Sequence, residues 1–214
     1  MELGDLFAQT RVLVTGGAGF VGANLVRRLA GEGATLTILD DFFTGKTENL
    51  RGLEGTYELV RGSVTERGLV NGLVAQHDII FHLAARNIIA STKNPYEDFE
   101  TNIGGTLNVL LAAREHQPKR VVYTSSVSIY GNPRYLPINE DDQISLLTPY
   151  AVSKYSGEGY CRAFYESYEV PVVRIAGSSR SLWPGRAREC RRPFTATASR
   201  RAISRTSKMR SRRP

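Results

Sequence analysis

The sequence predicts an α/β fold built on a doubly wound parallel sheet. Short runs of β-branched and aliphatic residues alternate with segments of helical periodicity along most of the chain. These runs are almost continuously apolar, which is typical of strands that are buried on both faces of a parallel sheet. A glycine-rich stretch, TGGAGFVG, joins the first run to the first helical segment. With 214 residues and 41% hydrophobic content, the chain is long enough for one such domain.

Six strands and four helices are expected from these patterns. The strand segments are 11–15, 35–39, 57–60, 78–83, 120–124 and 170–175. The helical segments are 20–31, 65–74, 95–116 and 149–168. Within 95–116, apolar side chains share one helical face, which we expect in the core or in a dimer interface. They are Phe99, Ile103, Leu107, Leu110 and Leu111.

The charge of the chain is unevenly distributed. Residues 1–178 contain 16 Lys and Arg against 20 Asp and Glu, a net charge of −4. Residues 179–214 contain 12 against 1, a net charge of +11, so the formal total of +7 comes from the last 36 residues. The main domain therefore gives no reason to expect nucleic-acid binding.

The cysteines and the N-terminus point to the cytoplasm. Cys161 and Cys190 have neither a C-x-x-C pattern nor a histidine at ligand spacing, so we expect no disulfide framework and no metal site. The stretch MELGDLFAQT lacks the apolar core of a signal peptide, and no 18 apolar residues run together. We expect a cytoplasmic protein without a membrane span.

The glycine-rich stretch indicates a dinucleotide site. Gly16, Gly19 and Gly22 lie where the first strand meets the first helix, and glycines there let the backbone and the helix N-terminus approach a pyrophosphate. Asp40 ends the second strand, where a carboxylate bonds the ribose hydroxyls of NAD and repels the 2′-phosphate of NADP. NAD is the expected cofactor. Lys46, close by in sequence, could soften that repulsion, which leaves NADP open.

A second group of residues predicts proton transfer. Tyr150 and Lys154 are four residues apart at the start of a helix, and Ser125 and Ser126 follow a strand at its carboxyl end, where open α/β sheets bind ligands. A carbinol carbon releases a hydride only as its hydroxyl loses a proton, and a free tyrosine with pKa about 10 is a poor base. The Lys154 ammonium and a positive nicotinamide ring favour the phenolate, and lowering its pKa to about 7 corresponds to about 4 kcal/mol. Tyr150 is the expected base, and Ser126 is expected to hold the substrate oxygen.

With TGGAGFVG, Asp40, HLAA, TSS and YAVSK in this order, the chain resembles the extended short-chain dehydrogenase/reductase family from about Arg11 to Val173. Within that family it is similar to the NAD-dependent nucleotide-sugar epimerases and dehydratases, and nearest to the UDP-glucose 4-epimerases. The resemblance implies a Rossmann-type fold, a UDP-hexose substrate and transient oxidation and re-reduction at C4. It also implies a homodimer that pairs through the helices 95–116 and 149–168.

The resemblance further implies the site residues. Catalysis would rest on Ser126, Tyr150 and Lys154. The cofactor would be bound by Gly16, Gly19, Phe20, Gly22, Asp40, Ala84, Ala85, Asn102, Ser125 and Lys154.

Two departures from the family pattern bear on the subfamily. Val127 and Ser128 stand where 4,6-dehydratases carry an Asp-Glu pair and related decarboxylases keep the Glu, so elimination and decarboxylation are disfavoured. Ser63 replaces the aspartate that meets the adenine amino group in the family, which weakens one cofactor contact. Epimerisation remains the expected reaction. A dehydratase and a non-catalytic dinucleotide sensor of the same fold are the alternatives.

After Val173 the chain departs from the family, which continues into a substrate-binding domain. We therefore expect an NAD-binding domain over 1–176 and a disordered, arginine-rich tail over 177–214, with no turnover by this chain alone. A shifted reading frame is one explanation, since suitable codons for 181–185, read from the second base, encode the family's Val-Tyr-Gly-Pro. A basic tail that binds nucleic acid or an anionic membrane is the other. We expect no specific nucleic-acid partner and no membrane.

Overall fold

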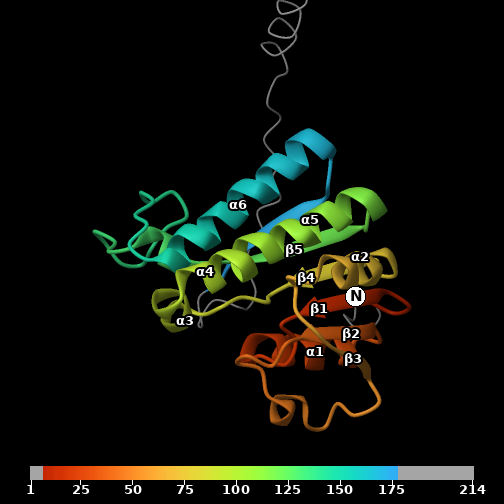
Figure 1. Ribbon diagram of the computed structural model, residues 1–214. Coiled ribbons are helices and arrows are strands. Elements are labelled where there is room, and N and C mark those ends of the chain that lie inside the picture. Colours follow the sequence, from red (N-terminus) through yellow and green to blue (C-terminus); the bar gives the residue numbers. More distant parts are fainter. Residues whose placement is uncertain (1–6, 178–214) are drawn as a thin grey trace, which may run out of the picture.

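The computed structural model describes residues 7–177, which form a six-stranded parallel sheet with helices on both faces (Figure 1). The strands are β1 (Arg11–Thr15), β2 (Thr35–Asp40), β3 (Tyr57–Arg61), β4 (Ile79–His82), β5 (Arg120–Ser126) and β6 (Val172–Gly177). All neighbouring strands pair in parallel, in the order β3-β2-β1-β4-β5-β6. This is the doubly wound Rossmann order, and it confirms the predicted fold class.

The predicted helices are present, together with short elements that lie outside the predicted segments. The α-helices are α1 (Phe20–Gly31), α2 (Arg67–Ala75), α3 (Ile88–Lys93), α4 (Pro95–Asp98), α5 (Gly105–His116) and α6 (Pro149–Tyr168). A π-helical segment, η3 (Phe99–Gly104), joins α4 to α5, and short 3-10 turns form η2 (Thr47–Leu50) and η4 (Val127–Tyr130). The elements outside the predicted segments are α3, η2 and η4. The sequence pattern missed α3, because six residues are too few to show a helical period.

The π-helical segment breaks the apolar face that was expected along 95–116. Leu110 is buried in the core, but the Phe99 side chain is 54% exposed. The wider π turn does not keep the 3.6-residue period, so residues before and after it do not stay on one face. Phe99 therefore does not lie in the core, and its place in a dimer interface stays a prediction.

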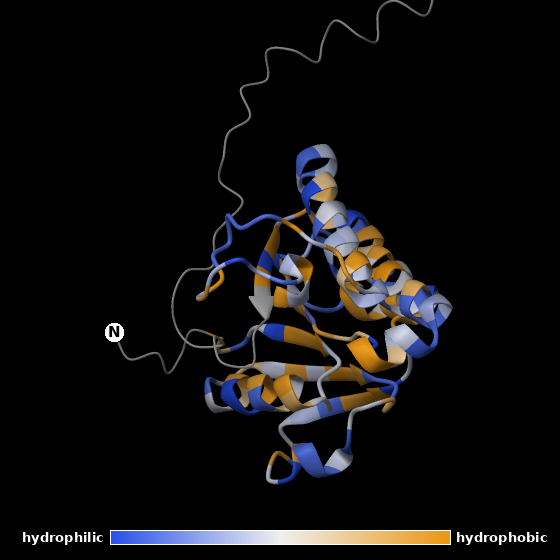
Figure 2. Cartoon of the chain, turned by 90° about the vertical axis from the view of Figure 1, so that its left-hand side faces the viewer, coloured by the Kyte–Doolittle hydropathy of each residue, from blue (hydrophilic) through white to orange (hydrophobic). Residues whose placement is uncertain are grey.

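The sheet separates two apolar clusters, because successive strand residues point to opposite sides. Leu13, Ile80 and Tyr123 pack on the side of α2, α5 and α6, whereas Val12 and Val14 pack on the side of α1. Figure 1 shows α5 and α6 running side by side on their face of the sheet, and Figure 2 shows apolar residues concentrated in the strands. Burial on both faces explains why the strands read as continuous apolar runs.

Some expectations fall outside residues 7–177. Residues 178–214 of the expected tail, with Cys190, are not described, whereas Gly177 still belongs to β6. Within the described part, no helix is long and apolar enough to cross a membrane. The same residues contain no group of three or more His, Cys, Asp or Glu placed to hold a metal ion.

Candidate cofactor and catalytic site

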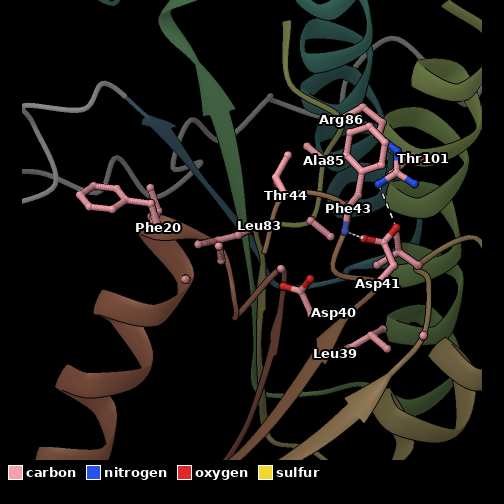
Figure 3. A pocket seen from close by; sticks show the side chains of 17 residues that line it. Phe20, Leu39, Asp40, Asp41, Phe43, Thr44, Leu83, Ala85, Arg86 and Thr101 are labelled. Atoms are coloured by element: carbon pink, nitrogen blue, oxygen red, sulfur yellow. Dashed lines mark hydrogen bonds and ion pairs between the residues drawn. The ribbon is translucent and has the colours of Figure 1, made fainter. Parts of the chain in front are cut away.

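A cavity of about 210 Å³ lies at the carboxyl ends of β1, β2 and β4, beside the start of α1 (Figure 3). This is the edge at which doubly wound sheets bind their ligands. Most of the residues expected to bind the cofactor line this one cavity. They are Gly16, Gly19, Phe20, Gly22, Asp40, Ala84 and Ala85.

Two glycines at the floor of this cavity, Gly16 and Gly22, have no room for a side chain. Gly16 has φ +73°, and a Cβ on it would lie 2.7 Å from the backbone nitrogen of Ala84. A Cβ on Gly22 would lie 2.7 Å from the Cα of Gly17. Helix α1 follows Gly19 without a side-chain cap and without an acid in its first turn, so the N–H groups of that turn have no side-chain partner from the helix itself. These features fit the pyrophosphate of a dinucleotide.

Asp40 is held rigidly at the same edge. One carboxylate oxygen accepts a hydrogen bond from the Ala18 N–H and the other from the Phe42 N–H, each at 2.8 Å. A carboxylate has further lone pairs, so these bonds orient it without exhausting its capacity for ribose hydroxyls. Lys46, the cation expected nearby, is not among the residues that line the cavity, and its backbone N–H donates to the Ala18 carbonyl.

The cation in the cavity wall is Arg86, which the sequence analysis did not single out. Its Nη1 lies 2.8 Å from an Asp41 oxygen, its Nε lies 2.7 Å from a Glu97 oxygen, and its guanidinium carbon lies 4.0 Å from the centre of the Phe43 ring. In Figure 3 the side chains of Arg86 and Asp41 point toward each other beside Phe43. Two sequence signals could have pointed to this pair: Arg86 directly follows HLAA, and Asp41 directly follows Asp40 at the end of β2.

Asn102 and Ser125 do not line the cavity, and each supports a neighbouring element instead. Asn102 is buried, and its side chain bonds both the N–H of Arg86, at 2.7 Å, and its carbonyl, at 3.1 Å. Asn102 therefore fixes the backbone of the loop after β4 instead of contacting the cavity. The Ser125 hydroxyl donates to Glu158 on α6. Ser63 accepts a hydrogen bond from the Thr65 N–H, and Gly62 and Val64 on either side of Ser63 line the cavity.

The structure brings Ser126 and Tyr150 together. Ser126 ends β5, and Tyr150 lies in the first turn of α6, which begins there because Pro149 occupies its first position and Thr148 caps it. The Ser126 hydroxyl lies near the Tyr150 phenol, where it favours the phenolate form. Ser128 donates to the same Ser126 oxygen from both its N–H and its hydroxyl, at 3.2 and 3.0 Å.

The protein's own groups do not turn Tyr150 into a base. Burial raises the pKa of Tyr150, the Ser126 hydroxyl opposes this, and the nearby Asp98 carboxylate raises it further. Lys154 is buried with its Nζ 2.7 Å from the Thr124 carbonyl, and burial lowers the pKa of its ammonium to about 8. The expected lowering of the Tyr150 pKa is thus not produced by the described protein groups.

Replacing Lys154 with methionine should stabilise the folded chain at pH 7 by about 1–3 kcal/mol, because it removes a cation that burial disfavours. The pKa of Lys154 falls from 10.5 to about 8 on folding, so its cost is complete below pH 8 and vanishes as the pH rises toward 10.5. Urea unfolding should therefore show a gain for the variant that shrinks between pH 8 and 10.5. Lys93→Met, at an exposed position of α3, is the control. A gain that does not change with pH would contradict this explanation.

The family model described as "NAD dependent epimerase/dehydratase family" matches residues 12–178. A UDP-glucose 4-epimerase from Mycolicibacterium smegmatis is 38% identical over 172 residues, which cover 78% of this chain and 55% of the relative. A UDP-N-acetyl-α-D-glucosaminuronate decarboxylase from Bacillus cytotoxicus is 34% identical over 172 residues, with coverage of 77% and 53%.

The fold is also similar to solved structures. The crystal structure of UDP-glucose 4-epimerase from Brucella ovis in complex with NAD superposes with a TM-score of 0.72 at 28% identity, over 78% of this chain and 51% of that one. The chain thus spans about half the length of the relatives that it matches.

Proposed function

This chain belongs to the NAD-dependent epimerase/dehydratase family, and on that premise we propose that it is the NAD-binding part of a nucleotide-sugar 4-epimerase of the UDP-glucose 4-epimerase kind. One observation carries the proposal: Ser126, at the end of β5, and the neighbouring Tyr150, at the start of α6, lie at the same edge of the sheet as the glycine-floored cavity. We assign this role to a domain over 1–176. The buried free thiol of Cys161 is compatible with the reducing cytoplasm in which we place it.

In this proposal the chain's residues position the sugar C4 hydroxyl and move its proton. Ser126 holds the C4 oxygen by a hydrogen bond, and Tyr150 takes the proton and later returns it. Bound NAD supplies the hydride acceptor and donor for transient C4 oxidation, and its oxidised ring adds the positive charge that favours a phenolate. Lys154 is held against the end of β5 by the Thr124 carbonyl, which fixes a second cation at this site.

The residues after Ser126 favour epimerisation over the other reactions known among the relatives. Val127 and Ser128 form the start of the η4 turn directly after Ser126. Neither side chain can act as a carboxylic acid, and the Ser128 hydroxyl is engaged with Ser126. The family resemblance implies that elimination and decarboxylation use a carboxylic acid at these two positions, so plain epimerisation is the reaction that we propose.

Cofactor titration tests the proposal directly. The full chain should bind NAD⁺ at least tenfold more tightly than NADP⁺, because about 1.4 kcal/mol of repulsion between Asp40 and a 2′-phosphate corresponds to a factor of ten. Calorimetric titration of both dinucleotides measures the ratio. Asp40→Ala should weaken NAD⁺ binding and bring the two affinities closer together. Equal affinities in the unchanged chain would count against the role of Asp40.

We also propose a homodimer that pairs through α4, η3 and α6. Tyr96 and Phe99 on the first two elements, and Val152 and Tyr155 on α6, are each more than 40% exposed although they are apolar or aromatic. Such a surface on contacting helices is typical of a protein interface. Light scattering at micromolar concentration should give twice the monomer mass, and Phe99→Glu should shift it toward the monomer. A monomer mass for the unchanged chain would contradict the proposal.

A further inference from the structure

We propose that Asp41 and Glu97 help to select NAD over NADP by neutralising Arg86, so that this arginine does not attract a 2′-phosphate. The inference rests on the proposed binding of a dinucleotide in the glycine-floored cavity. Arg86, Asp40 and Asp41 all line that cavity, and Arg86 is the one cation among its described lining residues. An arginine near the ribose normally admits NADP, so its presence here needs an explanation.

The geometry shows how the charge of Arg86 is used. Its Nε–H is directed to Glu97 on α4 at 2.7 Å, and its Nη1 is directed to Asp41 at 2.8 Å. The Phe43 ring covers the guanidinium plane at 4.0 Å. The Arg86 side chain is only 12% exposed as a result, compared with 28% for Asp41 and 34% for Glu97. Asn102 bonds the Arg86 backbone at both its N–H and its carbonyl, which fixes the backbone position from which the arginine reaches its two carboxylates.

The charges then decide the cofactor preference. Among the residues that line the cavity, Arg86 contributes one positive charge and Asp40 and Asp41 contribute two negative charges. Glu97 does not line the cavity, but it is paired with Arg86 and adds a third negative charge nearby. A 2′-phosphate, with a charge between −1.5 and −2 at neutral pH, would therefore meet a net negative wall. NAD has only a hydroxyl at this position and does not meet that repulsion. Three N–H groups of the guanidinium remain beyond the two ion pairs, and they would serve a phosphate if the carboxylates were neutral.

Calorimetric titration of the full 214-residue chain with NAD⁺ and with NADP⁺ tests the inference. In the double variant Asp41→Asn with Glu97→Gln, the ratio of the NADP⁺ and NAD⁺ dissociation constants should fall by about tenfold, since the cation becomes available to the phosphate. Glu97→Gln alone keeps the Asp41 ion pair and should give a fall of about threefold. This single variant keeps the test meaningful if the double variant does not fold.

Two controls separate this effect from others. Glu100→Gln with Glu166→Gln changes the net charge equally at exposed positions and should leave the ratio within about twofold. Adding Arg86→Met to the Asp41→Asn, Glu97→Gln double variant should abolish its gain in NADP⁺ affinity. An unchanged ratio in both the single and the double variant would overturn the inference, and so would a gain in NADP⁺ affinity that survives Arg86→Met. In either case, continued NAD⁺ binding would leave the proposed function intact. A chain that binds neither dinucleotide would overturn both.

Discussion

Tyr150→Phe should abolish epimerisation in a chain that has a complete substrate site. We expect a chimera of residues 1–177 with the C-terminal half of the Mycolicibacterium smegmatis relative to interconvert UDP-glucose and UDP-galactose. Tyr150→Phe should lower its kcat by about 10² to 10⁴, the usual contribution of a general acid–base group. The 214-residue chain alone should show no turnover, because positioning of the sugar can be worth roughly 7–11 kcal/mol, and the chain spans only about half of its relatives.

The control for this experiment is Tyr160→Phe, at an exposed position of the same helix. It removes the same hydroxyl and should leave kcat within about twofold. A Tyr150→Phe chimera with unchanged kcat would falsify the assignment of Tyr150 as the base. Turnover of UDP-glucose at an ordinary enzymatic rate by the 214-residue chain would contradict the proposal that the sugar contacts come from the part of the relatives that this chain does not match.

Gly22→Ala should weaken NAD⁺ binding by at least about tenfold and lower the stability of the fold by about 1–3 kcal/mol, the usual cost of overpacking a tight site. The added Cβ would meet the Gly16 carbonyl oxygen and lie 2.7 Å from the Gly17 Cα, both of which are backbone atoms that cannot turn away. The glycine loop would have to move, and the helix N-terminus would move with it. Calorimetric titration and thermal unfolding of the full chain measure the two effects.

Gly31→Ala is the matched control in the same helix. Nothing lies within 4 Å of a Cβ at Gly31. Gly31 is the last residue of α1 and has no left-handed φ, so alanine fits its backbone without strain. The control should therefore keep NAD⁺ affinity and be about as stable as the unchanged chain. If both variants bind NAD⁺ equally well, the close approach of α1 to the glycine loop is not needed for the cofactor.

Much of the fold followed from local pattern. The strand segments and the four long helices were predicted within a few residues, because apolar runs and helical periods are local properties of the chain. The pattern failed where local geometry departs from the regular period. The η3 segment turned Phe99 outward, and the six-residue helix α3 begins at a cap made by Asn87 that no periodic signal accompanies.

From the sequence alone, the glycines of the loop and the side chains of Asp40, Ser126, Tyr150 and Lys154 could be named as candidate site residues. Each belongs to a short motif at the end of a strand or the start of a helix. Only the tertiary structure decided which cation lines the cavity. Arg86 meets Asp41 and Glu97 because the sheet order places β2 and β4 on either side of β1, and no spacing along the chain encodes that meeting. The tertiary structure also decided the direction of the Tyr150 and Lys154 pKa shifts, because burial depends on every element packed around a side chain and not on its neighbours in sequence.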